Sequence, residues 1–184
     1  MPSSVHGTLA SMTMNSSVIG LATAAILYWP CSATADLQHV LILSPPVRPA
    51  CISSPFGPRV LPQHPFAGTY HYGVDLAALA GAPVLATASG KVIRIQKKGP
   101  GGLEVLVRHD GFVGIYSHLG MLAPPFARGK RAVAAGEKLG AVGRTGVISG
   151  SHVYFEMVLA GRPVDPAPYL QVPLCARRPA RPPA

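Results

Sequence analysis

Residues 152–157 read His-Val-Tyr-Phe-Glu-Met, a run in which polar and apolar side chains alternate. Alternate residues of a β-strand point to the same side of the sheet. We therefore expect Val153, Phe155 and the methionine that follows to face a core, and His152, Tyr154 and Glu156 to share the opposite face. This run predicts a sheet with one polar face, on which a functional site can be built.

A second segment, His71-Tyr-Gly-Val-Asp75, places a histidine and an aspartate four residues apart. An imidazole and a carboxylate are both ligands that zinc accepts in proteins. His71 and Asp75 are therefore candidate ligands of a divalent metal. The chain contains no His-Glu-x-x-His sequence, which excludes one common helical arrangement of zinc ligands.

The composition favours a single, mostly β domain. The chain has 184 residues, of which 20 are glycine and 20 are proline, and these residues interrupt every window that could form a long amphipathic helix. Short apolar runs between such residues predict strands. The expected strands are Val84–Ala88, Gly90–Lys97, Leu103–His109, Gly114–His118, Lys138–Val142 and Val153–Leu159.

The first 35 residues contain no Lys, Arg, Asp or Glu, and we expect them to be an export signal. Their apolar run, residues 18–29, is too short to span a bilayer comfortably, and Ala33-Thr-Ala35 offers a cleavage site. The basic residues that usually begin such a signal are missing, and a true start at Met12 or Met14 would account for that. We expect an exported protein, periplasmic or extracellular, with no stable membrane span once the signal is removed.

Three further boundaries follow from the sequence. Residues 36–51 contain three prolines, which constrain the backbone, and are expected to form an extended lead-in. Residues 52–170 are expected to form the folded domain. Residues 171–184, rich in proline and arginine, are expected to form a flexible tail.

The charge balance indicates which partners to expect, and the cysteines allow a disulfide. A formal net charge of +9 favours anionic surroundings such as a cell wall or lipid headgroups, although a generally basic composition gives the same balance. The arginine spacing and aromatic content do not resemble a nucleic-acid-binding module, so we expect no nucleic acid partner. Cys51 and Cys175 lie near the two ends of the domain; they either form a disulfide after export or remain separate buried thiols.

The order of short motifs resembles the M23 family, the LytM/lysostaphin-like zinc endopeptidases that cut peptide bridges in bacterial peptidoglycan. The resemblance runs through about residues 52–170 and implies a single folded-over antiparallel sheet of the duplicated hybrid motif type. The matching segments, in order, are Ile52–Arg59, His64-Pro65, His71-x-Gly73-x-Asp75, Gly81–Ala86, Gly90–Val92, His109-Asp-Gly111, Tyr116-Ser-His118-Leu119, Gly136–Gly146, Ser151–Glu156 and Gly161–Leu170.

The resemblance also assigns roles to residues. In the family, the His and Asp of the H-x₃-D motif bind zinc, and these match His71 and Asp75. The third protein ligand is the second His of an H-x-H motif, and this chain has Tyr154 at that position. The remaining two histidines of the family, which are catalytic and do not bind the metal, match His118 and His152.

Tyr154 allows two interpretations. As a phenolate it would be a poor third zinc ligand; as a neutral phenol it would cap a cleft that binds no metal, and zinc occupancy is doubtful for this reason. The retention of His118 and His152 argues against simple decay of the site. For His64 and His109, which also match positions that are often histidine in the family, we expect roles in turns and packing.

The functional expectation follows from Tyr154. We expect a degenerate zinc endopeptidase that acts as a wall-binding or hydrolase-regulating module, with peptidoglycan and a cell-wall hydrolase as partners. The alternative is an active zinc metalloendopeptidase that cleaves peptidoglycan peptide bonds with Tyr154 as its third ligand.

Overall fold

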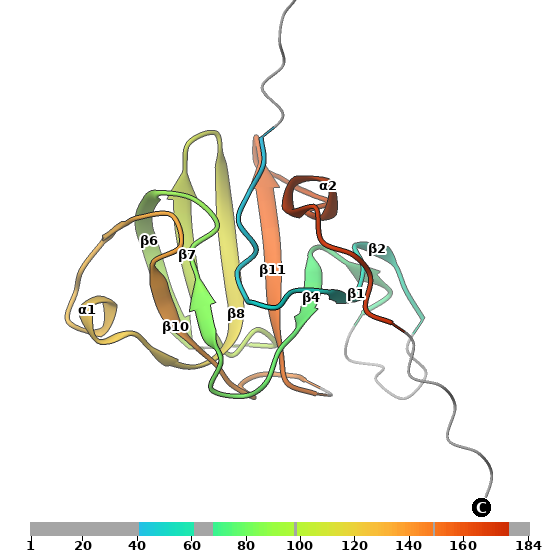
Figure 1. Ribbon diagram of the computed structural model, residues 1–184, viewed down its shortest axis with the longest axis horizontal. Helices are drawn as coiled ribbons and strands as arrows, with labels where there is room; N and C mark the ends of the chain where they lie inside the picture. The colour runs from blue at the N-terminus through green and yellow to red at the C-terminus, as the bar shows by residue number, and fades with distance from the viewer. Residues whose placement is uncertain (1–40, 61–67, 98, 149, 177–184) are drawn as a thin grey trace, which may run out of the picture. The chain divides into compact units, whose positions relative to one another are not determined.

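The strand expected at residues 153–159 lies in the middle of the sheet. The computed structural model describes residues 41–60, 68–97, 99–148 and 150–176. In this structure β11 (His152–Leu159) pairs antiparallel with β4 (Val74–Ala77) on one side and with β8 (Phe112–Leu122) on the other (Figure 1). Val153, Phe155 and Met157 are fully buried, and the residues between them are partly exposed, as the alternation predicts.

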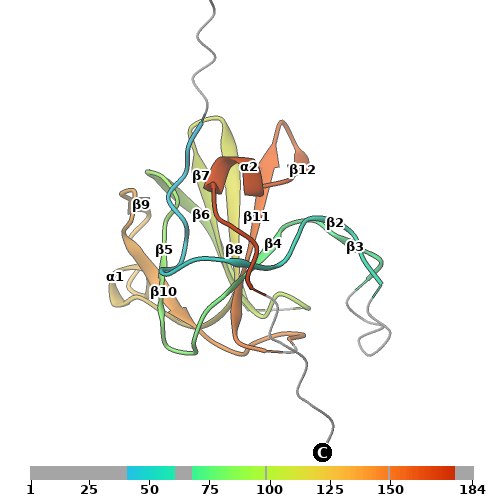
Figure 2. The same cartoon turned by 45° about the vertical axis from the view of Figure 1, so that its right-hand side comes forward.

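The rest of the sheet extends from these three strands. The remaining strands are β1 (Ile52–Ser54), β2 (Gly57–Pro58), β3 (Tyr70–His71), β5 (Pro83–Leu85), β6 (Gly90–Lys97), β7 (Leu103–His109), β9 (Ala132–Val133), β10 (Lys138–Val142) and β12 (Arg162–Val164). Among the described residues, ten strands form one sheet whose main path is β1–β4–β11–β8–β7–β6–β9, with β10 beside β8 and β5, and β12 beside β11. The strand pairings are antiparallel, and β2 and β3 form a separate pair beyond the β4 edge (Figure 2).

One face of the sheet forms the core. Leu43 and Val47, from the segment before β1, are buried with the apolar residues of the central strands, as is Leu170 of the one-turn helix α2 (Ala167–Leu170). The backbone of this segment is held in place, since Leu43 N–H donates to the Tyr169 carbonyl at 2.8 Å. Leu43 and Val47 of the expected lead-in are therefore part of the core.

The C-terminal end of the described chain is attached to β1. Cys51 and Cys175 form a disulfide, which decides between the two alternatives left open by the sequence. Ile52 also exchanges backbone hydrogen bonds with this segment: its N–H donates to the Pro173 carbonyl, and its carbonyl accepts from the Cys175 N–H. The residues expected to form a free tail from 171 onward are thus held against the sheet as far as Cys175, because the disulfide and these hydrogen bonds fix them.

The prediction of a mostly β chain with few helices is confirmed. The strands expected at β6, β7 and β10 have the expected bounds, β11 begins one residue earlier, β8 is longer, and β5 is shorter. The described helices are two single turns, α1 (Pro124–Ala127) and α2, each with proline in its first positions, where the missing N–H is not needed.

The N-terminal expectations lie outside the described residues. The structure describes no residue of the export signal expected at 1–35 or of the first part of the lead-in, and every described residue belongs to one compact unit, residues 39–184. Within the described ranges, no helix has the length and apolar character needed to cross a membrane.

Candidate functional site

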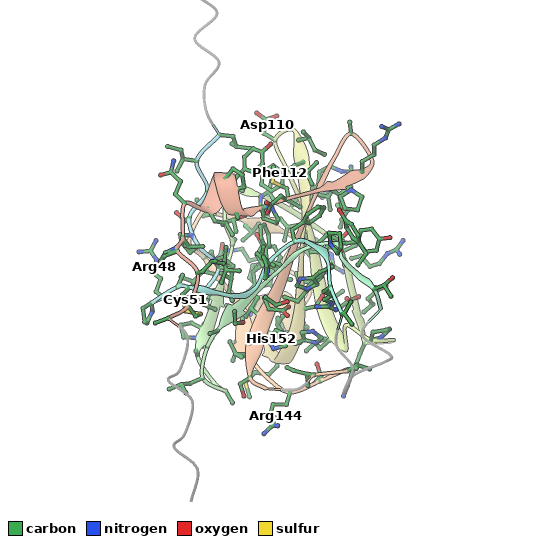
Figure 3. The ribbon with its side chains drawn as sticks, turned by 90° about the vertical axis from the view of Figure 1, so that its right-hand side faces the viewer. Arg48, Cys51, Asp110, Phe112, Arg144 and His152 are labelled. Carbon is green, nitrogen blue, oxygen red and sulfur yellow. A yellow bond between two sulfur atoms is a disulfide. The ribbon has the colours of Figure 1, made fainter. Side chains whose placement is uncertain are left out.

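The strand register brings the predicted site residues together. Tyr154 of β11 lies directly opposite Asp75 of β4 on one side and Ser117 of β8 on the other. Residues paired in this way share a face of the sheet. The five predicted residues, His71, Asp75, His118, His152 and Tyr154, all line one cleft of about 840 Å³ on the partly exposed face of the sheet. Figure 3 shows His152 on this side of the molecule.

Asp75 is the centre of the cluster. Its Oδ1 lies 3.2 Å from Nε2 of His71 and 3.3 Å from Nε2 of His152. Its Oδ2 lies 4.0 Å from Nη1 of Arg59. Burial alone would raise the pKa of the Asp75 carboxyl, but the hydrogen bonds from His152 and His71 outweigh it and hold that pKa well below its usual range.

Backbone carbonyls fix the orientation of the three histidine rings. Nδ1 lies 2.9 Å from a carbonyl oxygen in each case: that of Pro55 for His71, of Thr145 for His118 and of Gly150 for His152. A carbonyl only accepts, so each Nδ1 carries the hydrogen and Nε2 is the nitrogen directed at the site. His71 and His152 can then donate to Asp75 only as imidazolium ions; as neutral rings they present lone pairs to it.

His118 is held in an unusual backbone conformation. Its φ is 65°, in the left-handed region that residues other than glycine rarely adopt, and its N–H and carbonyl are both bonded to neighbouring loops. Burial lowers the pKa of the imidazole, which keeps it neutral near pH 7. Its ring lies 4.8 Å from that of His152 and 6.3 Å from that of Tyr154, measured between ring centroids.

The Tyr154 hydroxyl is directed at Glu156. It donates to Oε2 of Glu156, two residues further along the same strand, at 2.7 Å. Burial raises the pKa of the Tyr154 phenol far above its ordinary value, and the adjacent Glu156 carboxylate raises it further, because a phenolate there would face a like charge. In this structure the phenol is therefore a hydrogen-bond donor.

The absence of a side chain at Gly73 leaves space for the Tyr154 ring. A Cβ added at Gly73 would lie 2.4 Å from the carbonyl oxygen of Phe155 and 2.8 Å from Cε2 of Tyr154. The glycine of the H-x-G-x-D segment is therefore required by the close approach of β11, and no larger residue fits there without movement.

The cleft also contains charged residues that the sequence analysis did not assign to the site, among them Arg59 and Glu104. Glu104 of β7 accepts a hydrogen bond from the Ser117 hydroxyl at 2.8 Å. Burial raises the pKa of Glu156, and the like charge of Glu104 raises that pKa further. Alternation along β7 could have placed Glu104 on the same face as the site; Arg59 lies in a loop whose position no local pattern indicates. His109 is buried elsewhere, stacked on Phe112, in the packing role expected for it, and His64 lies outside the described residues.

The family follows from this fold and from the matching pattern. The sequence pattern of Peptidase family M23 matches residues 69–166, more than half of the chain. The chain belongs to peptidase family M23. The expected LytM/lysostaphin-like fold is confirmed: the catalytic domain of lysostaphin from Staphylococcus simulans superposes with a TM-score of 0.59 and 28% identity, over 66% of this chain and 92% of that one. A zinc containing peptidase from Vibrio cholerae superposes with a TM-score of 0.57 and 33% identity, over 66% of this chain and 37% of that one.

Relatives in the family include enzymes and an activator. The chain is 40% identical over 118 residues to the DD-carboxypeptidase/endopeptidase Mpg of Neisseria meningitidis, which covers 62% of this chain and 26% of that protein. It is 31% identical over 100 residues to the murein hydrolase activator NlpD of Escherichia coli, which covers 53% of this chain and 25% of that protein. The chain thus spans about a quarter of the length of these curated relatives.

The donor set does not fit a catalytic zinc ion. Such an ion usually has three protein ligands, and Tyr154, the side chain expected at the third position, donates to Glu156. No group of three or more His, Cys, Asp or Glu side chains within the described ranges is arranged so that it could hold a metal ion. M23 peptidases depend on zinc in general, and the relatives include a zinc containing peptidase.

Proposed function

We propose that this chain is an exported, peptidoglycan-directed M23 protein whose cleft binds the peptide part of the wall without hydrolysing it. The observation that supports the proposal is the Tyr154–Glu156 hydrogen bond, in which the side chain expected at the third ligand position donates to a carboxylate. We therefore expect the protein to act in the cell envelope. The names of the relatives indicate the same location for those proteins.

The cleft has the chemistry to bind a peptide. Its floor carries three of the seven acidic residues of the chain, Asp75, Glu104 and Glu156, beside the histidines. Its rim includes the exposed side chains of Tyr70 and Tyr72, whose rings lie 4.9 Å apart. A cleft that combines aromatic side chains with a few placed polar groups has the usual composition of a ligand-binding site.

Sedimentation with purified peptidoglycan tests this proposal. We expect the protein to sediment with the wall in rising salt and to release no soluble peptide fragments. His152→Ala should weaken sedimentation, whereas Lys138→Ala, at an exposed position that does not line the cleft, should not. Salt matters because a chain of net charge +9 binds any polyanion weakly, and screening removes that contribution.

A regulatory role would use the same cleft. The 31% identity to a murein hydrolase activator supports a cell-wall hydrolase as a partner. Addition of the chain to a wall digestion by such a hydrolase should raise the rate of release if the role is regulatory. An unchanged rate, together with intact wall binding, leaves wall binding as the function.

The second candidate function is a zinc endopeptidase. It is favoured by the retention of His71, Asp75, His118 and His152, which the fold brings to one cleft. It requires the Tyr154 hydroxyl to leave Glu156. Release of peptide fragments by the wild-type chain with added zinc would establish this candidate and remove the first proposal.

A further inference from the structure

The face of the sheet that carries the cleft continues past it toward β6. Glu156 lies opposite Ile115, which in turn lies opposite Leu106. One row further from the cleft, Val158 lies opposite Val113, which lies opposite Arg108. We call this surface the distal face; its residues are Arg94, Leu106, Arg108, Val113, Ile115 and Val158.

The distal face combines apolar side chains with cations that have no acidic partner. Leu106, Val113, Ile115 and Val158 are partly exposed, whereas the apolar residues on the other side of the same strands are buried. Arg94 and Arg108 are exposed on β6 and β7. Neither arginine takes part in any ion pair or side-chain hydrogen bond found within the described ranges.

A like-charge pair lies at its edge. Lys91 of β6 is directly opposite Arg108 of β7. Like charges directly opposite each other in an antiparallel pair destabilise the sheet. An anionic partner would reduce this repulsion. The relief of the repulsion would therefore contribute favourably to the free energy of binding.

The same surface is hollowed. A depression of about 320 Å³ has Arg108, Val113 and Val158 among its lining residues, with Gly161 at its side. A concave apolar wall beside a cation accommodates a side chain that projects from a partner. A lipid surface is a poorer fit, because membrane binding uses apolar side chains that project outward, and these are only partly exposed.

We propose that the distal face docks an acidic segment of a partner protein, with an apolar side chain of that segment in the hollow and its carboxylates against Arg94, Arg108 and Lys91. The surface lies outside the cleft, so this inference does not depend on what the cleft binds. Charge complementarity of this kind selects the partner and orients it.

Synthetic peptides test the docking. The probe carries Glu and Leu at alternating positions, and the matched peptide carries Lys and Leu. The full chain should bind the Glu/Leu peptide saturably, with amide chemical-shift changes centred on Val113, Ile115 and Val158. Arg108→Glu and Arg94→Glu should each weaken binding about tenfold, because each turns an attraction into a repulsion.

Two controls separate this site from general electrostatics. Arg144→Glu makes the same change of charge at the opposite end of the molecule from Asp110 and Phe112 (Figure 3) and should leave the affinity unchanged. Tyr154→Phe, in the cleft, should also leave it unchanged. The proposal is overturned by equal binding of the Lys/Leu peptide, by equal losses in all three charge reversals, or by shifts confined to the cleft. It is also overturned if anionic phospholipid vesicles bind and the Glu/Leu peptide does not.

Discussion

Replacing Tyr154 with phenylalanine removes one oxygen atom, the donor to Glu156 at 2.7 Å. A hydrogen bond to a charged group contributes about 1.5–3 kcal/mol, and because Glu156 is only partly buried we expect a loss of about 1–2 kcal/mol at neutral pH. Tyr72→Phe is the matched control: its side chain is 53% exposed, and the same change there should cost almost nothing. Urea unfolding of the two variants and the wild type measures the difference.

The pH dependence of this loss identifies the acceptor. Burial raises the pKa of Glu156, and the Tyr154 hydroxyl lowers it again by donating to the carboxylate. A raised pKa in the folded state stabilises the fold at low pH, and this contribution is lost as the pH rises through that pKa. Without the hydroxyl the pKa rises further, so the cost of Tyr154→Phe should grow between about pH 4 and pH 7. An equal cost at both values, or a cost no larger than that of Tyr72→Phe, would refute the hydrogen bond as described.

Three further predictions concern the framework of the site. Gly73→Ala should lower the free energy of unfolding by more than about 2 kcal/mol, since the added Cβ would lie 2.4 Å from the Phe155 carbonyl oxygen. Thermal unfolding measures this loss, and an unchanged midpoint would contradict the prediction. The Cys51–Cys175 disulfide closes a loop of 124 residues. Its reduction should lower the free energy of unfolding in urea by up to about 4–5 kcal/mol. An equal stability of the reduced chain would show that the bond does not stabilise the fold. Burial lowers the pKa of His109, so the stability that this neutral imidazole contributes is present above about pH 6.5 and should be lost as the pH falls. His109→Gln should flatten the dependence of the unfolding free energy on pH. An unchanged slope in this variant would show that other groups cause the dependence.

The long strands could be predicted from the sequence, and the short ones could not. β6 and β7 have seven or eight residues, enough for glycine boundaries and apolar runs to define them. β3 and β9 have two residues each, too few to show any alternation; β9 pairs with the longer β6, and β3 pairs with the equally short β2. The lead-in, expected to lie outside the domain, packs in the core through Leu43 and Val47, a long-range contact that no local pattern contains.

The site was predictable as a set of residues and not as a set of hydrogen bonds. Motif order indicated five of the side chains that line the cleft, and alternation placed Tyr154 and Glu156 on one face. Their mutual hydrogen bond depends on side-chain rotamers, and the carbonyls that orient His71 and His118 lie 16 and 27 residues away in the sequence. These details fix the histidine tautomers and the partner of the Tyr154 hydroxyl, and no sequence pattern contains them.

Zinc stoichiometry tests the account most directly. The wild-type chain, Tyr154→Phe, Tyr154→His and His71→Ala should be dialysed against zinc under the same conditions and analysed for bound metal. We expect little zinc in the wild type and no further loss in Tyr154→Phe, because the phenol donates to Glu156. Tyr154→His restores a three-ligand set and should bind about one zinc per chain. About one zinc in the wild type that is lost in both Tyr154→Phe and His71→Ala would contradict the account and make Tyr154 a metal ligand.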